Sequence, residues 1–256
     1  MQIRKAKDAK GDQKIKALIY AQSGGGKTTF CARCPKPLIL LTELQGVPSI
    51  LAANPEAEYV IVKTADDMRN ALKEIRELHA QGKAPWETIC LDGITESQII
   101  LKDELMARSM GKEKLTLEDW GILIDKTISI CRSYRDLPFH VVVTALATEE
   151  VTKEEGRIVR PSVYGKRLPN EIAGFFNVVS CLFKKTDDDG FVVHKALISG
   201  VDRFLTKGHP GLDGIEVPEL DVWIEKMSRP VPTDYFDNKQ PKLPDSKPKI
   251  NGGGKK

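Results

Sequence analysis

The segment ALIYAQSGGGKTTF, residues 17–30, constrains the possible folds more than any other part of the chain. An apolar run leads into three glycines, and Lys27 and Thr28 follow directly. Glycines permit positive φ and a close approach of the backbone to a ligand. A loop of the pattern Gly-x-x-x-x-Gly-Lys-Thr turns its N–H groups inward around phosphate oxygens, between a strand and a helix. The segment therefore predicts a strand–loop–helix unit that binds a nucleoside triphosphate.

One residue departs from this pattern. The loop reads AQSGGGKT, so Ala21 stands where the first glycine is usual, and alanine fits there if its φ is negative. The alternative is a glycine-rich turn with an adjacent lysine by chance, which the full spacing and the flanking apolar strand disfavour. We predict nucleotide contacts along the loop, at Gln22, Ser23, Gly24, Gly25, Gly26, Lys27, Thr28 and Thr29.

A carboxylate at the end of a later apolar run predicts a magnesium site. The run TICLD, residues 88–92, ends in Asp92, about 65 residues after Lys27 and, we expect, on the adjacent strand. In phosphate-loop proteins the hydroxyl that follows the lysine and a strand-end aspartate hold Mg²⁺. We therefore predict Thr28 and Asp92 as the metal site, Asp92 also as a cofactor contact, and Mg²⁺ with ATP as the cofactors.

Apolar strand patterns alternate with helical patterns through the middle of the chain. Strands are expected at 16–21, 37–43, 58–64, 87–93 and 139–145, with a helix after the loop lysine, one that begins after Thr64 and one at about 117–134. A hairpin is expected from 175–185 and 191–200 around the turn TDDDG. This order predicts an α/β fold with a central, mostly parallel sheet flanked by helices.

Charge is distributed unevenly along the 256 residues. Residues 1–16 carry a net +4 and residues 226–256 a net +5, which leaves −6 for residues 17–225. We predict a basic arm at 1–14, one domain at 15–228 and a disordered basic tail at 229–256. Basic arms on an acidic body suit a polyanionic partner, or they merely improve solubility. Five cysteines and the lack of an apolar leader or membrane segment predict a cytoplasmic protein, without a membrane partner.

The segments AQSGGGKTT, LILLTE, ICLDG, HVVVTA and GVDRFLTKG together resemble the RecA-like P-loop ATPases. More closely, they resemble the short phage ATP-binding and single-strand annealing proteins of that superfamily. The resemblance covers about residues 15–226. It implies a RecA-like P-loop core, ATP hydrolysis, assembly into a ring or filament, and the cytoplasm of a bacterial host.

The resemblance also implies roles for individual residues. Glu43, at the end of the second strand, would position or activate water, with Lys27 as the other catalytic residue of the same chain. Arg203 and Lys207 would enter a neighbouring subunit's site as cations that stabilise the transferred phosphoryl group. Thr144 is the nearest candidate for a γ-phosphate sensor, although the family often has an amide there. The alternatives are an ordinary strand-end carboxylate at Glu43 and a solvated basic turn at Arg203 and Lys207.

Two segments, 106–118 and 146–167, stand where RecA-like recombinases place their DNA-contacting loops. The second combines basic residues with one aromatic ring, which suits backbone neutralisation and base stacking on single-stranded DNA. Its four glutamates leave a plain solvated hairpin as the alternative. The predicted DNA contacts are Lys153, Arg157, Arg160, Tyr164, Lys166 and Arg167.

The sequence thus favours a slow, DNA-stimulated, magnesium-dependent ATPase of phage recombination type that binds single-stranded DNA as an oligomer. The basic tail could also recruit a single-strand-binding protein. The alternatives are an ATP-dependent protein-assembly switch without DNA binding and a helicase-like motor. A small-molecule or nucleotide kinase is the least favoured, because no segment supplies an arginine-bearing lid.

Overall fold

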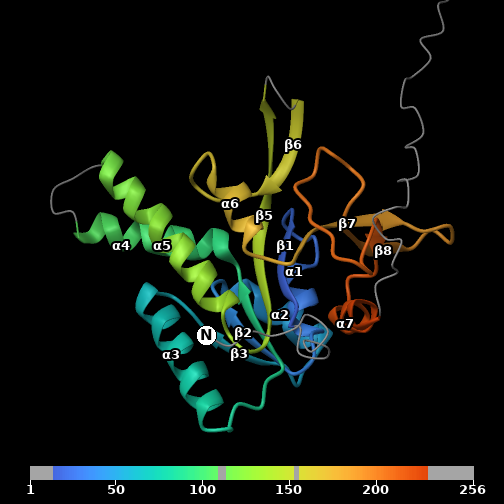
Figure 1. Cartoon of the computed structure of the whole chain (residues 1–256), viewed down its shortest axis with the longest axis horizontal. Helices are drawn as coiled ribbons and strands as arrows, with labels where there is room; N and C mark the ends of the chain where they lie inside the picture. Colours follow the sequence, from blue (N-terminus) through green and yellow to red (C-terminus); the bar gives the residue numbers. More distant parts are fainter. Residues whose placement is uncertain (1–13, 109–113, 153–155, 230–256) are drawn as a thin grey trace, which may run out of the picture.

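The computed structural model describes residues 14–108, 114–152 and 156–229. A sheet of nine strands forms its centre (Figure 1), in the order β3-β2-β4-β5-β1-β7-β8-β9, and β6 pairs with β5 outside this path. The strands are β1 Lys16–Ala21, β2 Pro37–Leu41, β3 Glu58–Ile61, β4 Thr88–Asp92, β5 His140–Thr152, β6 Gly156–Pro161, β7 Val178–Thr186, β8 Val192–Leu197 and β9 Ile215–Glu216.

Seven α-helices and one short 3-10 helix connect the strands in the described residues. They are α1 Lys27–Ala32, η2 Leu44–Gly46, α2 Val47–Ala53, α3 Ala65–Ala80, α4 Ile94–Arg108, α5 Leu117–Arg135, α6 Leu168–Gly174 and α7 Leu220–Ser228. The capping box predicted for α3 is present, because Thr64 accepts from the Asp67 N–H and Asp67 accepts from the Thr64 N–H. The short elements α2, α6, α7 and β9 had no sequence prediction, whereas β6 lies in the segment 146–167, for which a hairpin was one of the two expectations.

The strand pairing confirms the predicted α/β class. Strands β3, β2, β4, β5, β1 and β7 run parallel to one another, and the β7–β8 hairpin is antiparallel as predicted. β6 is antiparallel to β5. One prediction was wrong: β4, which carries Asp92, is not adjacent to β1. β5 pairs with both and lies between them, and its Val141, Val142 and Val143 are fully buried, as suits a central strand of a sheet that is covered on both faces.

Both faces of the sheet are buried, each by its own set of helices. In β1, Leu18 and Tyr20 belong to the core under α3–α6, whereas Ile19 and Ala21 belong to the core under α1, α2 and α7. On the second face the rings of Phe30 and Trp223 pack with centroids 5.2 Å apart and fix α7 on α1. The alternation follows from the two-residue period of a strand. Burial on both faces makes the centre of the sheet a rigid support for the loops that follow its strands.

The carboxyl ends of β1, β2, β4 and β5 all lie at one edge of the sheet, since these strands are parallel. β5 runs beyond this edge and returns as β6, so that the β5–β6 hairpin projects from the body of the molecule (Figure 1). No helix among the described residues has the length and apolarity to cross a membrane. The predicted arm and tail fall, apart from Lys14 and Arg229, outside the described residues, and the domain boundaries stay predictions.

Candidate nucleotide site

The phosphate loop follows β1 directly and has the backbone that its glycines permit. Gly24 and Gly26 have φ of 69° and 93°. A Cβ on Gly25 would lie 2.6 Å from the Cβ of Ala21, so only glycine fits against that side chain. Lys36 is the one described non-glycine residue with positive φ, and Ala21 therefore has the negative φ that its place in the loop requires.

Lys27 lies inside the curve of this loop. Its ammonium group donates to the carbonyl oxygens of Ala21 and Gln22, at 3.2 Å each. Burial lowers the pKa of Lys27, and the nearby carboxylates of Asp92 and Glu43 oppose this effect. The loop therefore holds a cation whose main interactions are with carbonyl groups that an incoming phosphate can replace.

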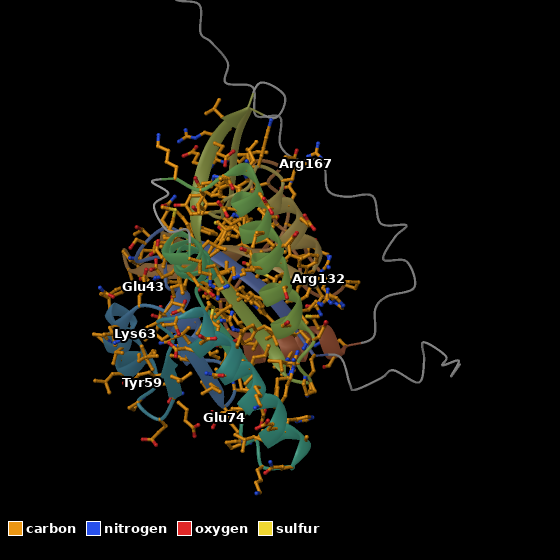
Figure 2. All side chains as sticks on the ribbon, turned by 90° about the vertical axis from the view of Figure 1, so that its left-hand side faces the viewer. Glu43, Tyr59, Lys63, Glu74, Arg132 and Arg167 are labelled. Atoms are coloured by element: carbon orange, nitrogen blue, oxygen red, sulfur yellow. The ribbon has the colours of Figure 1, made fainter. Side chains whose placement is uncertain are left out.

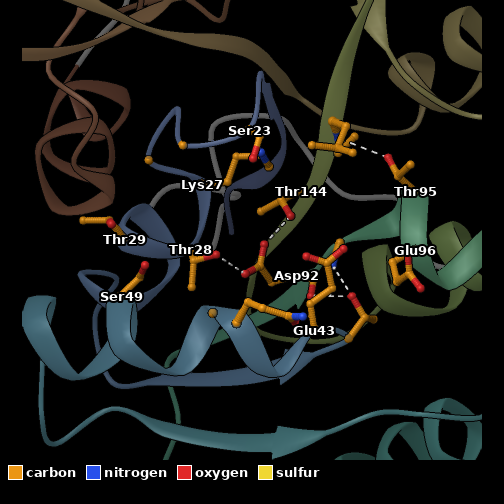
Figure 3. A pocket seen from close by; sticks show the side chains of 18 of the residues that line it. Ser23, Lys27, Thr28, Thr29, Glu43, Ser49, Asp92, Thr95, Glu96 and Thr144 are labelled. Atoms are coloured by element: carbon orange, nitrogen blue, oxygen red, sulfur yellow. Dashed lines mark hydrogen bonds between the residues drawn. The ribbon is translucent and has the colours of Figure 1, made fainter.

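Asp92 is the most constrained carboxylate of the site and is 7% exposed. The Thr28 hydroxyl donates to its Oδ2 at 2.6 Å, and the Thr144 hydroxyl donates to its Oδ1 at 2.5 Å. Figure 3 shows the two threonines pointing at Asp92 from different sides. The structure thus joins the loop, β4 and β5 at one carboxylate, and it brings Thr28 and Asp92 together as predicted for a metal site.

A cavity of about 390 Å³ opens beside these groups. Most of the residues predicted to bind nucleotide line it: Ser23, Gly24, Gly26, Lys27, Thr28, Thr29 and Asp92. Glu43 and Thr144 line it as well, whereas Gln22 and Gly25 do not. Glu43 follows β2 at the start of η2, where its side chain makes no capping hydrogen bond and faces the cavity.

Other lining residues had no predicted role: Gln45, Ser49, Thr95, Glu96, Lys184 and His194. Burial raises the pKa of Glu96, and the charges of Glu43 and Asp103 raise it further. Its position was readable in principle, since it lies in the first turn of the helix that follows Asp92. Lys184 and His194 come from β7 and β8, and the sequence carries no signal that brings their hairpin to the loop.

Arg203 and Lys207 do not line the cavity of their own chain. The Arg203 guanidinium lies 5.1 Å from the centre of the Phe204 ring and is exposed. The Lys207 ammonium donates to the Phe176 carbonyl oxygen at 2.8 Å, an interaction within the chain. The structure thus leaves Arg203 accessible to a neighbour and assigns Lys207 a contact of its own.

The predicted DNA contacts gather at and below the β5–β6 hairpin, but their charges are not equally available. Arg157 pairs with Glu149 and Arg160 with Glu150 across the hairpin. The Tyr164 ring lies 5.5 Å from the Trp120 ring, with the Lys102 ammonium 5.5 Å from its centre. Lys166 and Arg167 are exposed and have no ion pair with the described residues, and Lys153 lies outside the described residues.

Comparison with solved structures finds distant similarity. A KaiC-like protein of the archaeon Pyrococcus horikoshii is 15% identical with a TM-score of 0.38, over 79% of this chain and 88% of that one. An ATPase from the type III secretion system of pathogenic bacteria is 15% identical with a TM-score of 0.46, over 66% and 52%. The flagellar accessory protein FlaH of Methanocaldococcus jannaschii is 13% identical with a TM-score of 0.37, over 76% and 79%.

The chain spans about half the length of the secretion ATPase that it matches. Comparison with curated proteins finds no match. The family model of an AAA domain matches residues 13–211, which include the phosphate loop, Glu43, Asp92 and most of the sheet. The chain therefore belongs to this AAA-domain family, and its phosphate loop lies between a strand and a helix of an α/β sheet.

Proposed function

We propose that the chain binds magnesium ATP in the 390 Å³ cavity and hydrolyses it there. The observation that carries the proposal is the arrangement around Asp92: the Thr28 hydroxyl lies 2.6 Å from its carboxylate, and Glu43 lines the same cavity. A phosphate-binding loop, a metal-binding pair and a carboxylate free to take a proton are the three parts that phosphoryl transfer to water requires.

The groups present suit a hard cation. Asp92 and Thr28 offer oxygen atoms, the ligands that Mg²⁺ prefers, and part of the Mg²⁺ shell is usually water and phosphate oxygen. When bound, Mg²⁺ neutralises charge on the β- and γ-phosphate oxygens. The Thr144 hydroxyl, at 2.5 Å from Asp92 Oδ1, holds this carboxylate in one orientation.

Glu43 accepts the proton of the attacking water in this mechanism. The water adds to the γ-phosphorus, the bond from that phosphorus to the β,γ-bridging oxygen breaks, and the leaving oxygen stays with ADP. Lys27 and the loop N–H groups stabilise the negative charge that develops on the phosphate oxygens. Glu43 can serve as the proton acceptor because its side chain faces the cavity and makes no capping hydrogen bond.

Hydrolysis with and without metal tests this proposal. We expect release of phosphate from ATP in Mg²⁺ and none above background in excess EDTA. Lys27→Ala and Asp92→Asn should each lower the rate at least about a hundredfold, because each removes charge stabilisation from the transition state. Lys83→Ala, which removes an exposed lysine remote from the cavity, should leave the rate as it is. Hydrolysis that survives both site variants would contradict the proposal.

We further propose that single-stranded DNA stimulates this hydrolysis by binding at the β5–β6 hairpin. The support is a hydrogen-bonded link between the hairpin and the cavity. Thr95, which lines the cavity, accepts from the Leu146 N–H at 3.0 Å and donates to the Ser162 carbonyl at 2.8 Å. One turn later, the buried Gln98 makes two hydrogen bonds to the Tyr164 backbone. A ligand that moves the hairpin base would therefore act on the first turns of α4, beside Asp92.

Charge decides which hairpin residues would meet the DNA. Arg157 and Arg160 are neutralised by glutamates, so phosphate binding there must first break an ion pair. Lys166 and Arg167 have no such competitor among the described residues, and Tyr164, a residue that is 41% exposed, offers an aromatic ring. We therefore assign the backbone contacts chiefly to Lys166 and Arg167 and base stacking to Tyr164.

Binding of a labelled oligothymidine over a range of salt tests the DNA contact. Lys166→Ala combined with Arg167→Ala should weaken binding and reduce the salt slope by about 1.4, since each single-strand phosphate contact contributes about 0.7. Lys63→Ala combined with Lys83→Ala is the matched control, because it removes the same charge at two exposed positions outside the β5–β6 segment. Figure 2 shows Lys63 far from Arg167. Wild-type binding by the hairpin variant would contradict the assignment. Absence of oligonucleotide binding by the unmodified chain would favour a protein-assembly switch.

Completion of the site by a neighbouring copy is the last part of the proposal. Arg203 is exposed and does not reach its own cavity, as a residue supplied to a neighbour requires. Lys207 is less suited, because its ammonium already binds the Phe176 carbonyl. We assign the transferred-phosphate contact in an oligomer to Arg203.

A further inference from the structure

The two sides of β1 bring different chemistry to the cavity. On one side lie β5, β4 and β2, whose ends carry Thr144, Asp92 and Glu43. These groups bind metal and water in the proposed function, so this side receives the γ-phosphate. On the other side lie β7 and β8, which bring Lys184 and His194. A triphosphate wrapped by the loop after β1 would therefore direct its nucleoside toward Lys184 and His194.

His194 lies directly against the phosphate loop. A Cβ placed on Gly26 would be 2.9 Å from His194 Cδ2 and 3.2 Å from Nε2, so the imidazole occupies the space beside this glycine. The φ of 93° at Gly26 independently requires glycine. The β8 strand thus forms a wall of the loop in the same chain.

Lys184 lies beside this imidazole. β7 and β8 pair antiparallel with Lys184 opposite His194, and directly opposed residues of two strands project from the same face. Both side chains are exposed, and in the described part of the chain neither forms an ion pair or a side-chain hydrogen bond. A cation and an aromatic ring therefore line the cavity, and neither is held by a polar contact to another described residue.

We propose that Lys184 and His194 form the nucleoside-side wall of the ATP site, with the Lys184 ammonium on the α-phosphate and the His194 ring against the ribose and base. This inference rests on the proposed function. ATP and ADP share these parts, so the wall binds both equally. Such uniform binding lowers the Kd and KM of the nucleotide without raising kcat.

Neighbouring lysines provide matched controls. Lys185 follows Lys184, and Lys195 follows His194, and successive strand residues point to opposite faces. Lys184→Gln and His194→Ala change the wall, whereas Lys185→Gln and Lys195→Gln remove the same kind of charge from the other face. Titrations of ADP and ATP in Mg²⁺, with steady-state hydrolysis of each variant, give Kd, KM and kcat.

We expect Lys184→Gln to raise the Kd of ADP and the Kd of ATP by the same factor of about ten, as for loss of a charge-assisted hydrogen bond. His194→Ala should weaken both about threefold to tenfold, in line with loss of a stacked ring contact. The loss should appear in KM, with kcat retained in each case. Lys185→Gln and Lys195→Gln should bind ADP and ATP with the same Kd as the unmodified chain.

Two results would overturn the inference. Unchanged ADP and ATP affinity in both Lys184→Gln and His194→Ala would show that the pair contacts no nucleotide. Weakening confined to ATP would place the pair at the γ-phosphate instead. Failure of the proposed function looks different: the unmodified chain itself would then bind neither nucleotide, or Lys27→Ala would bind both normally.

Discussion

At the scale of single residues, three carboxylates with different surroundings lie at one cavity, those of Asp92, Glu43 and Glu96. Asp92 is 7% exposed and fixed by two threonine hydroxyls, which suits a metal ligand. Glu43 faces the cavity without a capping partner, which suits a proton acceptor. Burial raises the pKa of Glu96, and the charges of Glu43 and Asp103 raise it further. We assign the proton-accepting role to Glu43 because it faces the cavity at the end of β2 and makes no capping hydrogen bond.

Glu43→Gln tests that assignment. The amide cannot take a proton, so we expect hydrolysis to fall by about 10²–10³ while ATP binding is retained. Single-turnover release of phosphate measures the loss. Glu74→Gln, an exposed α3 residue in Figure 2, is the control for a lost charge outside the cavity. A larger loss in Glu96→Gln than in Glu43→Gln would assign the base to Glu96 instead.

His140 sets an acid limit on stability. It is 8% exposed, and its Nδ1 accepts from the Ile15 N–H at 3.0 Å, which requires the neutral ring. Burial, with the charges of Lys14 and Lys16, lowers the pKa of His140 from 6.5 to about 4. The unfolded chain therefore binds the proton more readily between these values. Stability is fully present above pH 6.5 and falls as pH decreases toward 4.

We expect this residue to contribute about 1–2 kcal/mol of that pH dependence, less than the full shift because solvent screens part of it. In His140→Asn the Oδ1 atom can replace Nδ1 as acceptor and does not titrate. The free energy of unfolding in urea, measured from pH 4 to 7, should therefore vary less in the variant. An identical pH dependence of the free energy of unfolding in both proteins would show that His140 does not cause the loss of stability in acid.

At the scale of elements, β5 connects the parts of the site. It pairs with β1 and β4, brings Thr144 to Asp92, and continues into the projecting hairpin. Its central position makes the proposed metal site depend on the Thr144 hydroxyl, which lies on neither the loop nor β4. The partners of a metal-binding carboxylate orient it and influence metal affinity.

Thr144→Val tests this role of β5. The variant keeps the branched shape but cannot donate to Asp92, so the Mg²⁺ concentration for half-maximal hydrolysis should rise about tenfold. Thr88→Val is the matched control, because the Thr88 hydroxyl at the start of β4 is buried without a hydrogen-bond partner. Equal Mg²⁺ dependence of all three proteins would contradict the proposed orientation of Asp92 by β5.

Elements with strong local signals were predictable from the sequence. The run KALIYA became β1 with the predicted bounds, and Thr64 with Asp67 caps α3 as expected. The short α2, α6 and α7 lack a long apolar period, and they form through packing such as that of Trp223 on Phe30. Local signals thus locate β1 and α3, whereas the short helices that depend on the core, and the extension of β5 to Thr152 beyond the predicted 139–145, do not follow from them.

The candidate site was predictable where local pattern decides it and not where strand order does. The loop, Asp92 and Glu43 follow from residues at strand ends, and they meet at one cavity. The position of β5 between β1 and β4 depends on pairing between distant segments, which no local pattern encodes. The same holds for Lys184 and His194, since only the fold brings β7 and β8 beside the loop.

At the scale of the whole molecule, assembly and DNA binding remain proposals with separable tests. Mixing Lys27→Ala with Arg203→Ala chains tests whether Arg203 acts on a neighbour. Each variant alone should be nearly inactive. Random mixing of equal amounts joins an intact loop to an intact arginine at about one interface in four of a head-to-tail oligomer. We therefore expect recovery to about a quarter of the unmodified rate.

A mixture no more active than the average of its two components would contradict the supply of Arg203 in trans. Lys207→Ala offers a comparison within the same segment. Because the Lys207 ammonium binds the Phe176 carbonyl, we expect Lys207→Ala to lower the stability of the chain. We do not expect mixing with Lys27→Ala chains to restore a lost activity in this variant. Thermal unfolding of the single variants separates the two effects.

The central claim is that one chain couples an ATP site to a single-stranded DNA site. The most direct test is the steady-state rate of ATP hydrolysis in Mg²⁺ with and without single-stranded DNA, with Lys27→Ala as the blank. We expect a low rate without DNA, a clear stimulation by DNA, and no activity above background in the blank. Hydrolysis that depends on Lys27 but is indifferent to DNA would contradict the coupling and leave an ATPase that acts on another partner.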